Sequence, residues 1–155
     1  MSKNKEYFSI EVEDTKSSCP AGEKVGLQNI AEGKIPVISC EGGCIRGEIA
    51  RVAAHLVAKE EGFGRGCHGE LFSVPGSAIS RWIREAEKVV LIDGCFLSCH
   101  KRMMQGFIEE DRLIHFDALS HYKDYTEFFY IDDVPEEERK RVARDVADWV
   151  VESLR

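Results

Sequence analysis

The feature of this sequence that most constrains its fold is a pattern that occurs twice. A short apolar stretch leads to a cysteine, a glycine-marked turn follows, and a second cysteine stands four residues after the first. The first copy covers residues 36–44 and the second covers residues 89–99. An amphipathic helical pattern follows each copy directly. Apolar strands alternating with helices predict an α/β fold whose parallel sheet is covered on both faces.

The hydrophobic periodicity places the expected elements along the chain. Strands are expected at residues 35–39, within 62–74, at 89–92 and at 113–116. Helices are expected at residues 45–60, 77–86, 96–107 and from 135 onward. These elements predict one three-layer domain over residues 35–155, flavodoxin- or Rossmann-like, with a mainly parallel sheet of four to five strands. Residues 1–34 would form an N-terminal extension, in which the alternation at residues 7–14 favours an added edge strand.

Charge and composition limit the partners and the compartment. The net charge of −7 argues against nonspecific binding to nucleic acid or to an anionic membrane surface. No apolar run approaches the roughly 20 residues that span a bilayer, and the N-terminus lacks the apolar core of a signal peptide. We therefore expect a cytoplasmic protein with reduced thiols. Its six cysteines then indicate metal ligands or redox groups rather than disulfides.

The two cysteine turns are expected to meet. In a sheet of order 2-1-3-4, the first and third strands are neighbours, and ligands bind beyond their carboxyl ends. Cys40 and Cys95 would face each other there, and Cys44 and Cys99 would follow one helical turn later. Cys67 would join this edge only if the second strand covers about residues 64–67. The turns themselves are supported by the following residues: Gly42, Gly43, Asp93 and Gly94.

The segment from Ile92 to Cys99 resembles the DGC-domain family, named for an Asp-Gly-Cys turn that here is Asp93-Gly94-Cys95. The resemblance includes Cys40, the Gly47-Glu48-Ile49 stretch and Cys67, and it covers roughly residues 35–125. Members of the family are described as zinc-binding proteins. The resemblance implies a ligand set, without assigning a reaction: Cys40, Cys67, Cys95 and Cys99. Cys44 departs from the family pattern.

The residues themselves agree with a thiophilic metal, most simply zinc, which takes four thiolate or imidazole ligands. An iron–sulfur cluster or Cu(I) would accept the same thiolates, and an empty thiol cluster is the remaining alternative. His100 could replace one sulfur, although a solvated helix histidine is the simpler expectation. We expect Asp93 to accept backbone N–H groups rather than to bind metal. A catalytic, sensory and storage role all stay open.

A rival hypothesis rests on residues 40–46, which satisfy Cys-x5-Arg between a strand and a helix. Low-molecular-weight phosphatases and related arsenate reductases place such a loop around an oxyanion. Cys40 would be the nucleophile and Arg46 the oxyanion clamp. Against this, Gly47 stands where those families have Ser or Thr, and no Asp-Pro dipeptide supplies a general acid.

A third hypothesis is a non-catalytic interaction module with a structural metal. The segment at residues 122–131 is rich in aromatic residues, and it is a candidate for contact with a protein partner or with a second copy of the chain. Core packing is the expectation for most of its rings.

Overall fold

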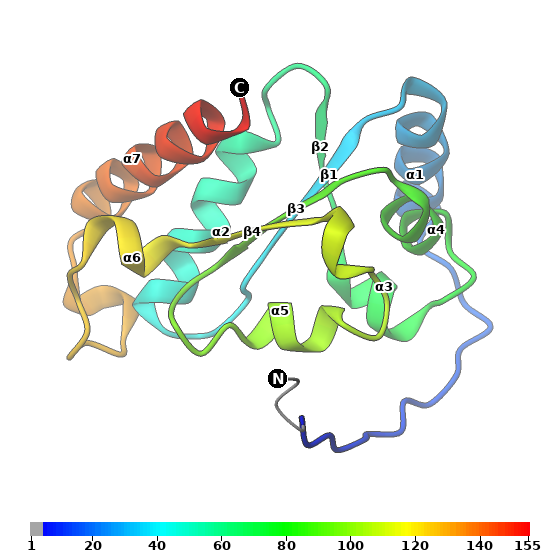
Figure 1. Cartoon of the computed structure of the whole chain (residues 1–155), viewed down its shortest axis with the longest axis horizontal. Coiled ribbons are helices and arrows are strands. Elements are labelled where there is room, and N and C mark those ends of the chain that lie inside the picture. The colour runs from blue at the N-terminus through cyan, green and yellow to red at the C-terminus, as the bar shows by residue number, and fades with distance from the viewer. Residues whose placement is uncertain (1–4) are drawn as a thin grey trace.

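The computed structural model describes residues 5–155 and has a four-stranded, all-parallel sheet at its centre (Figure 1). The strands are β1 (Ile35–Ser39), β2 (Phe63–Arg65), β3 (Val89–Asp93) and β4 (Leu113–Asp117). Their order in the sheet is β2-β1-β3-β4, with each neighbouring pair parallel. This confirms the expected α/β class and the strand order on which the meeting of the two cysteine turns depends.

Helices cover both faces of the sheet, which gives the three layers (Figure 1). Helices α2 (Ile45–Val57) and α7 (Glu136–Leu154) pack on one face, and α4 (Ala78–Glu85) packs on the other. Alternate residues of each central strand serve the two cores, because side chains alternate along a strand. Val37 belongs to the core under α2, whereas Ile38 belongs to the core under α4.

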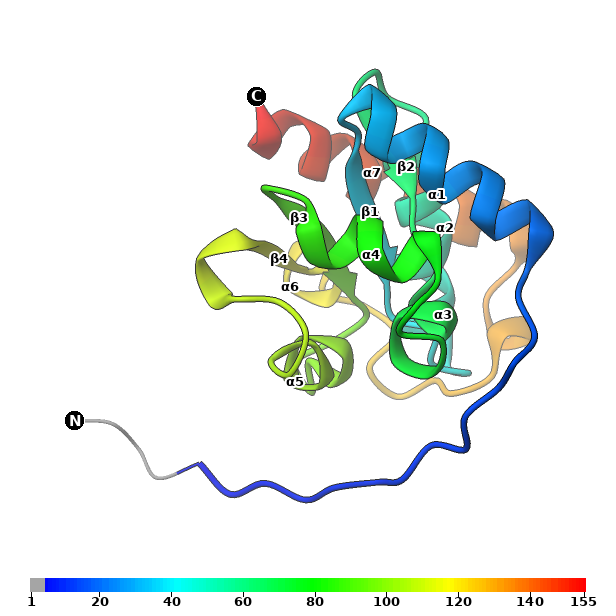
Figure 2. The ribbon, with the colours of Figure 1, turned by 90° about the vertical axis from the view of Figure 1, so that its right-hand side faces the viewer.

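The other elements are shorter or lie outside these layers. They are α1 (Pro20–Glu32), α3 (His68–Ser73), α5 (Cys99–Met104), α6 (Ala118–Tyr122) and the 3-10 turns η1 (Glu110–Arg112) and η2 (Ile131–Asp133). Helix α1 packs against α4 (Figure 2), and the Glu23 carboxylate accepts a hydrogen bond of 2.9 Å from the Ala78 amide at the start of α4. Ser77 caps α4 as its sequence position predicts, through a 3.1 Å bond from the Ser80 amide.

Three sequence-based expectations are wrong in detail. The helix expected at residues 96–107 is only Cys99–Met104, because Ser98 takes a left-handed conformation with φ of 48° and delays the start of the helix. Residues 7–14 form no strand; they are extended and exposed, and the missed helix α1 follows them. Within residues 122–131, Tyr125 is buried, but three rings expected in the core are exposed: Phe128, Phe129 and Tyr130.

No helix among residues 5–155 combines the length and the apolar character needed to cross a membrane.

We predict that Gly26→Ala destabilises the protein, because Gly26 lies where α1 crosses α4. A Cβ at this position would stand 2.6 Å from the Ala78 carbonyl carbon and 2.7 Å from the Ile79 nitrogen, and neither backbone atom can move freely. The free energy of unfolding, measured in urea, should fall by about 1–3 kcal/mol. Gly106→Ala is the control, since a Cβ there meets no atom within 4 Å; equal stability of the two variants would contradict this packing.

Candidate metal centre at the carboxyl edge of the sheet

The strand order brings most of the cysteines to one edge of the sheet. Cys40 follows β1, Cys67 follows β2, and Cys95 and Cys99 follow β3, and these three strands are adjacent. Strand β2 ends at Arg65, two residues before Cys67, so Cys67 lies at this edge and not at the opposite one. In parallel sheets the carboxyl ends of neighbouring strands border the usual ligand site.

Cys40 is the most enclosed of these thiols, with 8% of its surface exposed. Its Sγ accepts a hydrogen bond of 3.3 Å from the Gly42 amide, and the Gly94 amide also donates to it. Burial raises the pKa of the Cys40 thiol, and the negative charge of Asp93 adds to that effect, while the two amides oppose it. Without a cation nearby, Cys40 therefore stays a neutral thiol.

Asp93, the last residue of β3, is 1% exposed and is hydrogen-bonded to two other elements, α5 and β4. Its Oδ1 accepts a 3.2 Å bond from the His100 amide, and its Oδ2 accepts a 3.1 Å bond from the Lys101 amide, both in α5. The His115 Nε2 of β4 lies 2.9 Å from Oδ2. Burial raises the pKa of this carboxyl, but the bonds from His115 and the two amides outweigh burial and hold the pKa below its usual value.

His100 is buried, with 8% of its surface exposed, so the expectation of a solvated helix histidine is wrong. Its Nδ1 is enclosed and has no hydrogen-bond partner among the described residues; the closest carboxylate oxygen, Asp93 Oδ1, is 3.8 Å away. Burial lowers the pKa of His100, so its imidazole is neutral near pH 7. The His68 ring lies 4.6 Å from the His100 ring, centroid to centroid.

Cys40, Asp93 and His100 together form a group that could hold a metal ion. One ligand atom from each lies within 4.8 Å of the other two, and all three residues are buried. Within residues 5–155, this is the group of cysteine, histidine and acidic side chains that meets that condition. A sulfur, a neutral imidazole nitrogen and a carboxylate oxygen are donors that zinc accepts.

Backbone contacts between the two turns fix the position of this group. A Cβ at Gly94 would stand 2.9 Å from the Arg46 carbonyl carbon and 3.0 Å from the Gly47 nitrogen. A Cβ at Gly47 would in turn overlap the Gly42 carbonyl. Only glycine allows the Asp-Gly-Cys turn, the start of α2 and the Cys40 loop to approach this closely. A Cβ at Gly43, by contrast, would meet no atom within 4 Å.

Cys44 and Arg46 stand at the start of α2 and interact with each other. Cys44 is the N-cap of α2, and its Sγ accepts a 3.4 Å bond from the Gly47 amide. Burial raises the pKa of Cys44, but hydrogen bonds from Gly47 and from Arg46 outweigh burial and lower the pKa overall. The Arg46 guanidinium also donates a 3.3 Å bond to the Thr126 carbonyl. The thiol that Arg46 stabilises is thus Cys44 rather than Cys40, which does not favour the Cys-x5-Arg enzyme.

The remaining thiols stand outside the compact group. Cys67 is exposed at the start of α3, and Cys95 and Cys99 are partly exposed. An electrostatic interaction with Cys99 is among the influences that raise the pKa of Cys40, so Cys99 is a neighbour of the group. Cys19, which the sequence left unplaced, is exposed and caps α1 through a 3.3 Å bond from the Gly22 amide. That Cys67, Cys95, Cys99 or Cys44 binds metal stays a prediction.

The family model of the DGC domain matches residues 36–146, more than half of the chain. The chain belongs to the DGC-domain family. The match spans all four strands of the sheet and the three members of the buried group. No curated protein and no solved structure matches this DGC domain.

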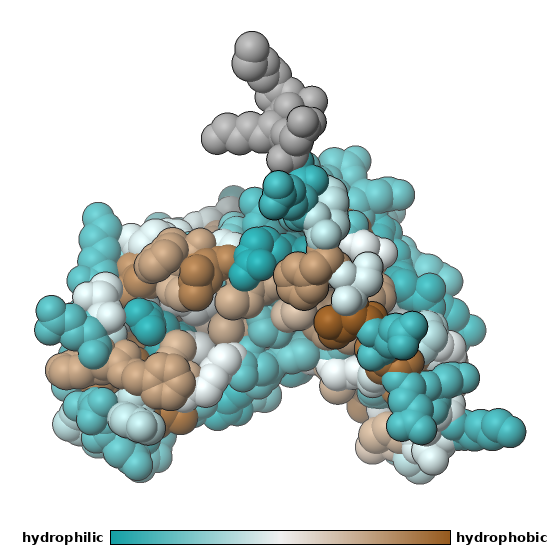
Figure 3. Space-filling view, turned by 90° about the horizontal axis from the view of Figure 1, so that it is seen from below, coloured by the Kyte–Doolittle hydropathy of each residue, from teal (hydrophilic) through white to brown (hydrophobic). Residues whose placement is uncertain are grey.

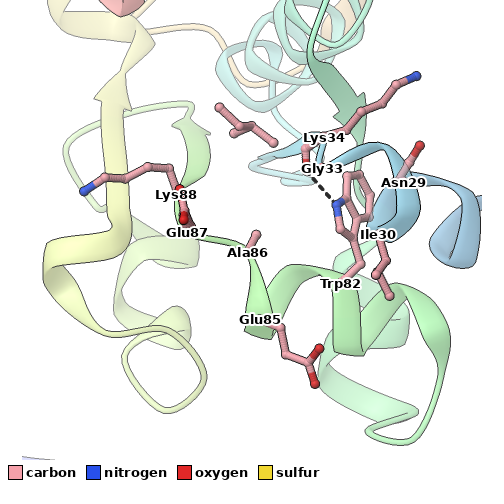
Figure 4. Close-up of a pocket in the computed structure, with 10 residues that line it drawn as sticks. Asn29, Ile30, Gly33, Lys34, Trp82, Glu85, Ala86, Glu87 and Lys88 are labelled. Atoms are coloured by element: carbon pink, nitrogen blue, oxygen red, sulfur yellow. Dashed lines mark hydrogen bonds between the residues drawn. The ribbon is translucent and has the colours of Figure 1, made fainter.

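A cavity of about 530 Å³ lies at the opposite, amino end of the strands (Figure 4). Lys34 and Lys88 stand on its rim, and the Trp82 indole on its wall donates a 2.8 Å bond to the Lys34 carbonyl. No cysteine or histidine lines this cavity, so it is separate from the group of Cys40, Asp93 and His100.

The pKa of His68 predicts a pH dependence of stability. Burial, together with the nearby His100, lowers this pKa from 6.5 to about 4. Between pH 6.5 and about 4 the unfolded chain binds a proton at His68 and the folded chain does not. The contribution of the neutral, buried His68 to stability is therefore fully present above pH 6.5 and is lost progressively as the pH falls toward 4. In His68→Leu, the decline of the unfolding free energy across this window should be smaller, as measured by urea unfolding of metal-free protein; an unchanged slope would contradict the burial of a neutral imidazole.

Proposed function

We propose that this DGC domain binds a thiophilic divalent metal, with zinc as the expected ion, at the group of Cys40, His100 and Asp93. The observation that carries the proposal is the unpartnered Nδ1 of His100, enclosed beside a buried thiol and a buried carboxylate. A buried polar atom without a hydrogen bond costs free energy unless something supplies the missing interaction. A metal ion at this point would supply it.

The surroundings of Cys40 support the same proposal. Two backbone amides already point at its Sγ, and such amides stabilise a thiolate rather than a thiol. Burial alone keeps the proton on the sulfur, because a buried anion without a partner is unfavourable. A bound cation reverses that balance and deprotonates the ligand. The turn therefore favours a thiolate at Cys40 only when a cation is bound next to the sulfur.

Asp93 would supply the oxygen ligand, and its hydrogen bonds hold it in position. Its bonds to two amides of α5 and to His115 fix the orientation of its carboxylate and of the helix that carries His100. Carboxylates that bind metals are usually hydrogen-bonded themselves in this way. We propose Cys99, adjacent to His100, as the fourth ligand, with Cys67 or Cys95 as the alternatives that follow from the family resemblance.

The mixed donor set favours zinc over the other thiophilic groups. Iron–sulfur clusters are held mainly by four thiolates, and a buried group with one cysteine provides fewer. A sulfur–nitrogen–oxygen set suits zinc, whereas Cu(I) prefers sulfur. A Cys-x5-Arg enzyme would need Arg46 beside Cys40, and Arg46 instead bonds to Cys44 and Thr126.

We predict that Cys40→Ser reduces bound metal at least about tenfold, because a serine oxygen is a much weaker ligand for zinc than a thiolate. The measurement is elemental analysis of full-length protein purified without oxygen or chelators, in which the wild type should hold about one zinc per chain. Cys19→Ser is the matched control: Cys19 also caps a turn through a backbone amide at 3.3 Å, but it is exposed and remote from the group. Equal metal in both variants would refute the assignment.

A second pair of variants distinguishes the two ligand sets. If His100 is a ligand, His100→Leu should lose the metal while Cys67→Ser keeps most of it. The reverse result would replace the proposed set by the four cysteines of the family resemblance. Thermal unfolding of each metal-free variant shows whether a loss reflects the site or the fold. Iron in the wild type would keep the site and change its chemistry to that of a redox cluster.

A further inference from the structure

The N-terminal arm, defined as residues 5–18, presents an apolar stripe that no other part of residues 5–155 covers. Every residue of the arm is exposed, and among residues 5–155 its hydrogen bonds join only Asp14 to Thr15 and Thr15 to Ser17. Phe8 and Ile10 are 86% and 77% exposed. They alternate with Ser9 and Glu11, so one side of the extended arm is apolar and the other polar. An exposed apolar stripe of this kind indicates a contact surface.

A second uncovered apolar surface lies around the start of α5. We call it the α5 face and define it by three residues, Phe96, Leu97 and Met103, which are 73%, 55% and 45% exposed. Figure 3 shows apolar residues gathered on this underside of the molecule, the side on which α5 lies in Figure 1. Phe96 and Leu97 belong to the turn that Ser98 ends with its left-handed backbone, so the fold itself holds them outward.

The charges of the arm and of the α5 face are complementary. The arm carries four acidic residues and two lysines: Glu6, Glu11, Glu13, Asp14, Lys5 and Lys16. The segment 96–107 carries Lys101 and Arg102 and has no acidic residue. Opposite charges of this kind orient two surfaces and accelerate their association.

The arm extends beneath the carboxyl edge without packing on it. Figures 1 and 2 show the arm leading from the start of α1 and passing under α3 and α5. An extended segment of this length spans about 40 Å, which is ample to reach another molecule. Since every arm residue stays exposed although α5 is close, the arm of one chain does not cover its own α5 face.

We propose that the protein forms a symmetric homodimer in which the arm of each chain packs its apolar stripe on the α5 face of the other. A two-fold axis uses the same pair of surfaces twice, so the contact closes and does not propagate into a fibre. Both apolar surfaces are then covered, and Glu6 and Asp14, which flank the stripe on the same side of the arm, lie near Lys101 and Arg102. Because α5 begins at Cys99, each arm borders the candidate metal centre of its partner.

The test is the mass of the full-length protein in solution, followed by light scattering after size exclusion over a dilution series. The wild type should be a dimer at high concentration. Phe8→Glu combined with Ile10→Glu should raise the dimer dissociation constant by about 100-fold or more, since two apolar contacts are lost on each of two arms. Leu97→Glu on the α5 face should have the same effect. The substituted residues are exposed, so the fold should stay intact, as unfolding temperature would verify.

The matched control is Ser9→Glu, which adds a negative charge to the polar side of the same arm and should leave the dimer unchanged. A wild type that is monomeric at every concentration would overturn the proposal. So would a double variant that dimerises like the wild type. Slow amide exchange of residues 7–12 in a monomer would show instead that the arm covers its own chain, and it would equally exclude the exchanged dimer.

Discussion

The buried carboxylate of Asp93 is the interaction on which the rest of the carboxyl edge depends. It ends the central strand β3, bonds to the first amides of α5 and meets His115 on the neighbouring strand β4. A charge that is 1% exposed is tolerated only because these donors surround it. In return, the carboxylate fixes where α5 begins and therefore where His100 lies relative to Cys40. The short aspartate side chain thus sets the shape of the candidate metal centre.

Glycine supports that arrangement by removing side chains where the two turns touch. Gly94 packs against the backbone of Arg46 and Gly47, and Gly47 packs against Gly42. These contacts bring the amide of Gly94 and that of Gly42 to the sulfur of Cys40. The Asp-Gly-Cys sequence can be understood in these terms: the aspartate holds the helix, the glycine permits the close approach, and the cysteine lies beyond it, partly exposed.

The same turns separate the thiols into different environments. Cys40 is enclosed beside the imidazole of His100, and burial raises the pKa of the Cys40 thiol. Cys44, four residues later, is paired with Arg46 and has a lowered pKa. One edge of the sheet therefore offers both a thiol whose ionisation burial disfavours and a thiol whose ionisation Arg46 favours.

The sequence by itself determined the α/β class, the parallel sheet and the edge at which Cys40, Cys95 and Cys99 collect, because periodicity and strand-to-turn patterns are local properties. It did not show that His100 is buried, since one histidine in a short polar helix has no periodic signal. It also missed α1, whose mixed face packs on α4. Only the tertiary structure decided which cysteine pairs with Asp93 and His100, because that choice depends on backbone contacts between turns some 50 residues apart.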